Sequence, residues 1–472
     1  MPEKYHIHVH PTPPRFPAHG KSTVLDWGEG CVRCTHCVKE TCPYNAFDQR
    51  DFDQASLTDT IDSFCKNCYR CVQGCPRELV VKTLNPQYDR MGDDYWTPEI
   101  LLSTWYQAET GKIPVSGAGY GGPFSGDGFD SIWTDMSEIV RPTRDGIHGR
   151  EYISTAIDLG RHPLFLVFDD TGNLALEPFS PLIEIPLPVV LAEPPFGAGL
   201  SQVLQSSVNA ARRLGTLTLV SRSQVTPELA EFSSHLIPSY AAGALDLDDP
   251  LLQEVRLVEI LDSDDVVAQV DAFKRRYPQT VCMVKVTGDG QAASRVADLA
   301  AAGAEVIHLA AGTQGRGIGD ASEVHLKDLI RQTHLRLVEH KLRDTVTVLA
   351  SGGVAMAEHV AKAIICGVDG VVVDLPLLIA LECRMCRRCL EGEPCPVDMD
   401  QVSVTRGAQR LVNLMGAWNN QLLEVLGAMG LREVRRLRGE VGRAMFVEDL
   451  HKEIFGPLFA PPAPASGRRE GE

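Results

Sequence analysis

Cysteines dominate the chemistry that this chain of 472 residues could perform. Twelve of its 14 cysteines fall into three short motifs, each ending in a cysteine followed by proline. Thiols grouped this closely are typical of metal sites, and three cysteines separated by two residues each can wrap one iron–sulfur cube. The motifs hold Cys31, Cys34, Cys37 and Cys42, then Cys65, Cys68, Cys71 and Cys75, and finally Cys383, Cys386, Cys389 and Cys395.

The first two motifs resemble the two-cluster ferredoxin run, in which the fourth cysteine ligates the other cube. The first motif has one extra residue before its last cysteine, which a longer loop absorbs. A pair of zinc sites is the alternative, but zinc has no preference for a third cysteine at the same short spacing. The resemblance implies two 4Fe–4S centres, one held by Cys31, Cys34, Cys37 and Cys75 and the other by Cys65, Cys68, Cys71 and Cys42.

Histidines alternate at the N-terminus, where His6, His8 and His10 would share one face of a strand. Such a row could chelate a metal. We favour a simpler interpretation, because no carboxylate or fourth ligand lies nearby in sequence. The pattern then predicts a β-strand that lies along the sheet of a neighbouring domain.

A glycine-rich stretch at 116–130 predicts a loop. Behind it, four cationic side chains gather within ten residues, and a solvated turn is the favoured interpretation. The alternative is an anion site or a domain junction, because arginine suits carboxylate and phosphate. The four residues are Arg141, Arg144, His148 and Arg150.

Strands and helices alternate from about residue 184 onward. Short runs rich in β-branched residues predict eight strands, with amphipathic helices between most of them. Eight such units close most naturally as a (β/α)8 barrel, whose chemistry belongs at the C-terminal ends of the strands. The strands are expected near 186–192, 216–221, 236–240, 255–260, 280–286, 305–310, 345–350 and 369–374.

Ser351, Gly352 and Gly353 end the seventh strand where a helix begins. Backbone amides there could surround a phosphate, which this fold usually binds at its last two loops. A plain tight turn is the alternative, and Asp374, at the end of the eighth strand, is an awkward neighbour for phosphate.

Lys285 ends the fifth strand, where its charge could form an ion pair or lie beside a flavin and favour the reduced anion. The loop after the sixth strand would bring Gly312 close to a flat ring or carry Arg316 over it as an anion ligand. Cys282 and Cys366, outside the motifs, are expected to be buried apolar thiols.

From residue 280 to residue 396 the chain resembles the FMN-binding domain of the glutamate synthases, and the ferredoxin motifs ahead of the barrel resemble the archaeal-type form without a glutaminase domain. The resemblance implies FMN bound by Lys285, Gly312, the Ser351–Gly353 loop and a Phe-Gly-Ala turn, with Lys285 catalytic. That turn is Phe196, Gly197 and Ala198.

Two features depart from the family pattern. The family's third cluster is 3Fe–4S on three cysteines, whereas Cys386 is additional here and Cys395 comes one residue late, so four thiolates favour 4Fe–4S. The Gly-Glu-Gly-Gly loops that shape the 2-oxoglutarate site are missing, which leaves the substrate open.

The implied activity is that of an oxidoreductase. Clusters supply single electrons, and FMN collects two for reduction of 2-iminoglutarate to glutamate. The expected partners are a ferredoxin or another redox protein, and a separate glutaminase or reductase subunit, since residue two is Pro2 and no N-terminal cysteine nucleophile is present. The alternatives are an electron-transfer subunit that makes no glutamate, and a scaffold that has lost its flavin site.

The composition and the ends of the sequence argue against three classes of protein: nucleic-acid-binding, membrane-spanning and secreted proteins. A net charge of −17 opposes nucleic-acid binding, no apolar run is long enough for a membrane span, and the N-terminus lacks the order of a secretory signal. A cytoplasmic location is therefore expected. The predicted organisation is an N-terminal arm (1–20), a ferredoxin-like domain (21–90), a connecting region (91–180), the barrel with the third motif (181–396), C-terminal helices (397–459) and a disordered tail (460–472).

Overall fold

The computed structural model describes residues 5–16, 22–27, 32, 34, 36, 40–43, 68–84, 86–113, 126–134, 153–163, 165, 168–173, 180–197 and 199–459. Several predictions fall outside this part of the chain. They concern Cys31, Cys37, Cys65, Ala198, most of the glycine-rich stretch, the cationic cluster from Arg141 to Arg150, and the tail.

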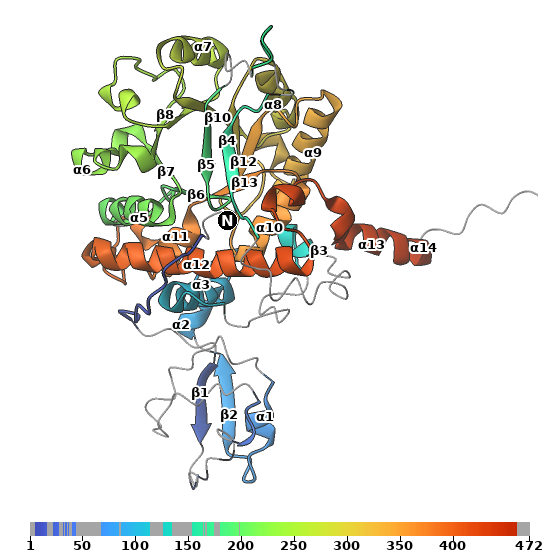
Figure 1. Ribbon diagram of the computed structural model, residues 1–472. Coiled ribbons are helices and arrows are strands. Elements are labelled where there is room, and N and C mark those ends of the chain that lie inside the picture. Colours follow the sequence, from blue (N-terminus) through green and yellow to red (C-terminus); the bar gives the residue numbers. More distant parts are fainter. Residues whose placement is uncertain are drawn as a thin grey trace, which may run out of the picture.

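A closed ring of eight parallel strands forms the centre of the molecule, as predicted (Figure 1). Around the ring the order is β10, β11, β12, β13, β6, β7, β8 and β9, so that the last strand in sequence pairs with the first. Each predicted strand overlaps one observed strand. These are β6 (Val189–Ala192), β7 (Thr218–Ser221), β8 (Leu236–Tyr240), β9 (Leu257–Leu261), β10 (Val281–Thr287), β11 (Val306–Ala310), β12 (Thr347–Ser351) and β13 (Gly370–Val373).

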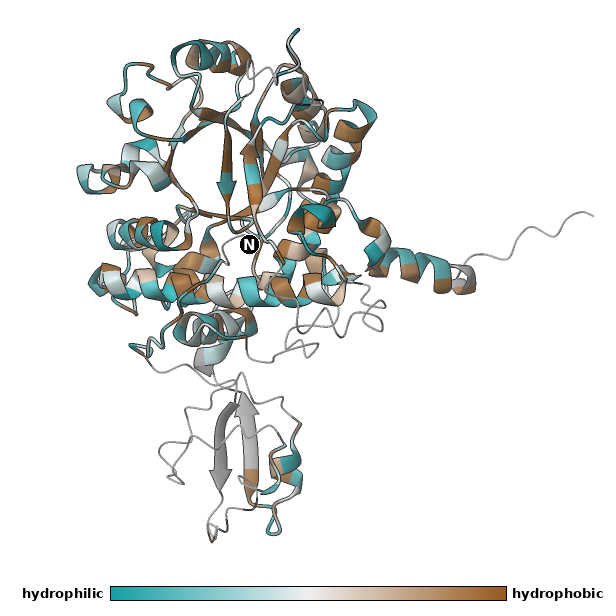
Figure 2. Ribbon diagram, in the orientation of Figure 1, coloured by the Kyte–Doolittle hydropathy of each residue, from teal (hydrophilic) through white to brown (hydrophobic). Residues whose placement is uncertain are grey.

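The strands form because their β-branched and aliphatic residues are buried on both faces, as in β11, where every residue is buried. Figure 2 shows this as apolar strands inside helices whose outer faces are polar. Five long helices separate the strands: α5 (Leu200–Leu214), α7 (Val266–Arg276), α8 (Ala292–Ala301), α9 (Leu326–Glu339) and α10 (Ala357–Cys366). The segment from β7 to β8 contains the short α6 (Pro227–Ala230) between two 3-10 turns (Arg222–Gln224 and Ser233–His235), and one 3-10 turn (Pro250–Gln253) joins β8 to β9.

An antiparallel hairpin covers the N-terminal end of the barrel. It consists of β4 (Ile157–Gly160) and β5 (Leu182–Ile185). The Thr347 hydroxyl at the start of β12 donates to the Gly160 carbonyl at 2.9 Å, and Arg161 donates to the carbonyls of Ala300 and Ala304 at 3.0 Å. This end of the ring is therefore covered by protein.

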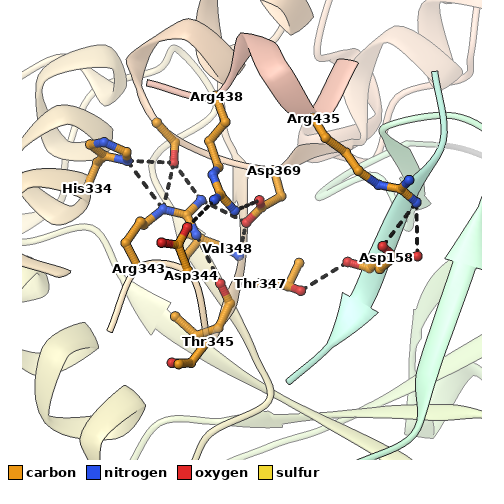
Figure 3. A network of polar contacts seen from close by, with 12 residues as sticks. Asp158, His334, Arg343, Asp344, Thr345, Thr347, Val348, Asp369, Arg435 and Arg438 are labelled. Atoms are coloured by element: carbon orange, nitrogen blue, oxygen red, sulfur yellow. Dashed lines mark hydrogen bonds and ion pairs between the residues drawn. The ribbon is translucent and has the colours of Figure 1, made fainter. Parts of the chain in front are cut away.

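A partly buried ion-pair network fixes the same end to the C-terminal part of the chain (Figure 3). Arg343 bonds Asp369 at 2.8 Å and donates to the Gly367 carbonyl, while Arg438 reaches the other Asp369 oxygen at 2.8 Å. Burial alone would raise the pKa of Asp369, but Arg343 and then Arg438 outweigh it and lower that pKa. The network is structural, because its groups satisfy one another.

Further helices pack around the barrel. The stretch predicted to be helical after residue 396 includes α12 (Val404–Ala428), α13 (Val447–Ile454) and α14 (Gly456–Phe459). The long α12 packs on α5, on α3 (Pro98–Thr110) and on α11 (Leu375–Ala380). Its leucines and methionines are mostly core residues, as expected.

The prediction of a β-strand in the N-terminal arm was wrong. Residues 5–16 form no strand, and they lie against helices and not along a sheet. The His10 amide donates to Asn413 of α12 at 3.0 Å, and the Thr12 amide donates to Glu109 of α3 at 2.8 Å. Alternation of apolar and polar residues fits any extended segment with one buried side, so His6, His8 and His10 are simply its exposed face.

The described parts of the N-terminal region include an antiparallel pair, β1 (Ser22–Trp27) with β2 (Val80–Leu84), and the helical turn α1 (Arg70–Gln73). The pair brings together the two ends of the stretch that carries the first two cysteine motifs. A ferredoxin-like domain stays a prediction. None of the described helices is long and apolar enough to cross a membrane.

Candidate functional site

The third cysteine motif folds into a single pocket directly after the barrel. Its four cysteines line this pocket with Phe196 and Gly197, at the C-terminal end of β6, and with Leu378 of α11. The motif winds tightly, and Glu382, Met385 and Arg387 have positive φ values, so that the thiols turn inward. The thiols are those of Cys383, Cys386, Cys389 and Cys395.

These thiols are close enough for electrostatic interactions with one another. Burial, followed by the charges of the neighbouring thiols, raises the pKa of Cys383 to about 12, despite a hydrogen bond from the Met385 amide at 3.4 Å. Four mutually repelling sulfurs around one pocket are a costly arrangement in a bare protein and a favourable one around a positive metal core. The donor set therefore fits a four-thiolate cluster, and a cluster on these four cysteines stays a prediction.

Inside the barrel, polar side chains from separate strands join in one chain. Glu259 of β9 is fully buried and contacts His308 of β11, with its Oε2 atom 2.6 Å from Nδ1. The other ring nitrogen lies 2.8 Å from Oγ of Ser351, at the end of β12. Ser239 of β8 donates to Oε1 of Glu259 at 2.7 Å. A serine–histidine–glutamate chain therefore runs from the lumen to the loop that was predicted to bind phosphate.

The Ser351–Gly353 loop requires glycine for two reasons. Gly352 and Gly353 have φ values of 105° and 66°, which other residues rarely adopt. A Cβ atom on Gly352 would lie 2.6 Å from the Gly312 carbonyl, and one on Gly353 would lie 2.4 Å from the Gly315 amide. The loops after β11 and β12 are thus packed backbone to backbone, which explains the position of Gly312.

Lys285 and Asp374 complete the charged groups of the lumen. Lys285 pairs in register with His308, so both side chains are on the same face of the sheet. Its ammonium influences Glu259 and Asp374 but forms no hydrogen bond or ion pair with any described residue. Burial raises the pKa of Asp374. A cation that has no partner among the described residues fits an anionic ligand at the barrel mouth.

Sequence reasoning missed several groups at this mouth. Tyr95, just before α3, donates its hydroxyl to the Gly353 carbonyl, and Trp96 donates to the Thr313 carbonyl at 3.0 Å. Glu259 and His308 were missed too, although each is a polar residue inside an apolar strand, which is a readable signal. Arg316 is engaged elsewhere, since it donates to the Glu323 carbonyl at 3.1 Å.

The second cysteine motif is described in part. Cys71 lies in α1 and is buried, whereas Cys68 is exposed. Amides of Leu79 and Arg77 lower the pKa of Cys75, and the Leu79 amide lies 3.4 Å from its sulfur. Amide donors to sulfur suit a thiolate that ligates a cluster. In the first motif, Cys34 and Cys42 lie within the described residues.

The two cysteines outside the motifs are buried, as predicted. Cys282 and Cys366 are each 1% exposed. Burial raises the pKa of both thiols, that of Cys366 to about 12. They are inert core residues.

Comparison with known proteins agrees with the resemblance to the glutamate synthases. Residues 249–432 match the family model described as "Conserved region in glutamate synthase". An archaeal-type glutamate synthase (NADPH) from Dehalococcoides mccartyi is 25% identical over 469 residues, covering 87% of this chain and 92% of that protein. An archaeal glutamate synthase (NADPH) from Archaeoglobus fulgidus is 25% identical over 493 residues, covering 90% and 94%. Among solved structures, a mutant flavocytochrome b2 with pyruvate bound has a TM-score of 0.42 at 12% identity, covering 71% and 94%.

Proposed function

We propose that this chain, whose residues 249–432 belong to the glutamate synthase family, is an iron–sulfur flavoprotein oxidoreductase that forms glutamate from 2-oxoglutarate. The observation that carries the proposal is the pocket of four thiols directly after the last barrel strand. A cluster in this pocket would be a one-electron centre next to a barrel mouth that carries polar groups for an anionic ligand.

The barrel residues have separate roles in this proposal. The amides of Gly353 and Val354 donate no hydrogen bond to any described residue. Together with the Ser351 hydroxyl, they would hold the phosphate of FMN. Lys285 would supply positive charge to the ring, and Gly312 would keep the neighbouring loop close. FMN, when bound, supplies the conversion of one-electron to two-electron transfer.

Electrons would reach the third motif from the first two. The segment between β2 and α3 supports this order, because it contacts the third motif directly. The Gly92 amide donates to the Arg384 carbonyl at 3.1 Å, and Asp93 forms an ion pair with Arg387. A ferredoxin or another redox protein is the proposed donor, and NADPH, which forms part of the relatives' names, is the alternative.

The test is glutamate formation by the full chain, purified anaerobically, from 2-oxoglutarate, ammonia and either reduced ferredoxin or NADPH. We expect a flavin spectrum, about twelve iron atoms for three 4Fe–4S centres, and glutamate. Cys389→Ser should lose iron and glutamate formation, whereas Cys366→Ser, which removes a buried thiol outside the motifs, should keep both. A preparation without bound flavin would refute the proposal.

A second function is favoured by the β7 and β8 units, which have only the short α6 and three 3-10 turns where the family's substrate loops are expected. In that case the protein relays electrons to a larger redox complex. Intact flavin that is reduced by the donor, without glutamate as product, would identify the relay.

A further inference from the structure

The Glu259–His308–Ser351 chain has the spacing of a proton relay. The histidine ring lies between a carboxylate 2.6 Å from Nδ1 and a hydroxyl 2.8 Å from Nε2, and it is 2% exposed. Both ring nitrogens therefore have a polar partner: Nδ1 contacts Glu259 in the lumen, and Nε2 contacts Ser351 at the barrel mouth. Nothing in the barrel architecture requires such a chain, since apolar residues fill most lumens of this size.

The state of Glu259 determines which nitrogen carries a proton. Burial alone would raise the pKa of this carboxyl, but His308, and then Lys285 and Ser239, outweigh burial and lower that pKa. An ionised Glu259 has no proton to donate, so Nδ1 of His308 must donate to it. The neutral and the charged ring then differ only in whether Nε2 carries a proton.

The proton on Nε2 determines whether the Ser351 hydroxyl accepts a hydrogen bond from His308 or donates one to it. When His308 is neutral, Nε2 accepts a hydrogen bond, so the Ser351 hydroxyl donates inward and presents only lone pairs to the mouth. When His308 is protonated, Nε2 donates to Ser351, and the hydroxyl proton becomes free to donate to a ligand. An anion beside Ser351 is therefore bound better by the protonated form.

Opposite charges face His308 from the neighbouring strands. Glu259 on β9 contacts Nδ1, and Lys285 on β10 pairs in register with His308 on the same face of the sheet. Asp374, after β13, also faces this group, and burial raises its pKa.

We propose that Glu259, His308 and Ser351 make the loop after β12 a proton-coupled anion site, in which His308 gains a proton when a phosphate-bearing ligand binds. The inference rests on the proposed function, which places the FMN phosphate at this loop. His308 is a positioning residue, because it acts on the ligand through the hydroxyl of Ser351.

The test is calorimetric titration of the full chain, purified anaerobically and stripped of flavin, with FMN at pH 8. Above the second pKa of a phosphate group, about 6, the ligand brings no proton of its own. Titration in two buffers of different ionisation enthalpy gives the number of protons exchanged. We expect net proton uptake with FMN and none with riboflavin, which lacks the phosphate, and FMN affinity should fall by up to about tenfold per pH unit for one linked proton.

Variants of the chain identify the residue that takes up the proton when FMN binds. His308→Gln can still form hydrogen bonds but cannot become charged, so it should bind FMN without proton uptake. Ser351→Ala keeps the Glu259–His308 pair intact and should also abolish the uptake, which covers a failure of His308→Gln to fold. If FMN binds with heat independent of the buffer, or if Asp374→Asn alone abolishes the uptake, the inference is wrong while the proposed function stands. If neither FMN nor riboflavin binds, both are wrong.

Discussion

Lys285 is the residue through which the protein would most directly tune a flavin. Its ammonium has no direct partner among the described residues, although it is close enough to Glu259 and Asp374 to affect their ionisation. Because reduced flavin is an anion, Lys285→Met should lower the two-electron reduction potential, by about 30 mV if the charge contributes about 1.4 kcal/mol. Lys285→Arg is the control and should retain most of the potential. Spectroelectrochemistry measures both, and an unchanged potential in a flavin-loaded Lys285→Met protein would contradict this role.

Individual site residues were predictable from sequence only when their spacing was local. The cysteines of the third motif lie within 13 residues, and the structure brings all four to one pocket. Glu259 and His308 lie 49 positions apart on β9 and β11, so their contact depends on both strands pairing with β10. A polar residue within an apolar strand signals that a partner exists, but it does not identify the partner.

At the scale of elements, the Arg343–Asp369–Arg438 network determines how the C-terminal segment is attached to the barrel. Asp369 links β13 to both arginines and accepts from the Val348 amide at 2.8 Å. Asp369→Asn would leave the buried Arg343 charge without its counter-ion, so we expect the free energy of unfolding to fall by about 3–5 kcal/mol. Chemical denaturation measures this, and Asp344→Asn, which removes an exposed partner of Arg438, should cost less than about 1 kcal/mol.

The same network predicts the direction of a pH effect. The folded state lowers the pKa of Asp369, so its contribution to stability is complete above the unfolded-state pKa of about 4 and is lost as the pH falls through the lower, folded-state value. The stability difference between the wild type and Asp369→Asn should therefore shrink in acid. Denaturation midpoints measured from pH 7 downward test this, and a difference that grows in acid would show that the sign is wrong.

The eight strands could be predicted because each is a short apolar run whose burial needs no information from elsewhere in the chain. The N-terminal arm could not, since Ile7 and Val9 alternate with histidine in the same way whether they pack on a sheet or on helices. What decides between these is the surface already formed by α3 and α12, where Gly111 and Gly416 leave room for Val9. The arm and α12 come into contact although they lie more than 400 positions apart along the chain.

For the whole molecule, Glu382 is where the N-terminal arm, α12 and the third motif meet. It is 5% exposed, and Arg15 donates to it from both its amide and its side chain at 2.7 Å. Arg15 also donates to the Val397 carbonyl at 2.9 Å, so a single arginine holds both ends of the cysteine loop, and Arg406 of α12 reaches Glu382 at 3.3 Å.

Glu382→Gln should therefore loosen the cysteine loop without unfolding the barrel, because it weakens contacts to the arm and to α12 together. We expect loss of up to four iron atoms, those of one 4Fe–4S centre, with flavin still bound and the far-ultraviolet circular dichroism unchanged. Glu393→Gln is the matched control, since Glu393 lies on the same loop but pairs with Arg388 at the surface. Equal iron content in Glu382→Gln and the wild type would mean that the loop holds its shape without the arm, and loss of flavin together with iron would mean that Glu382 supports the barrel itself.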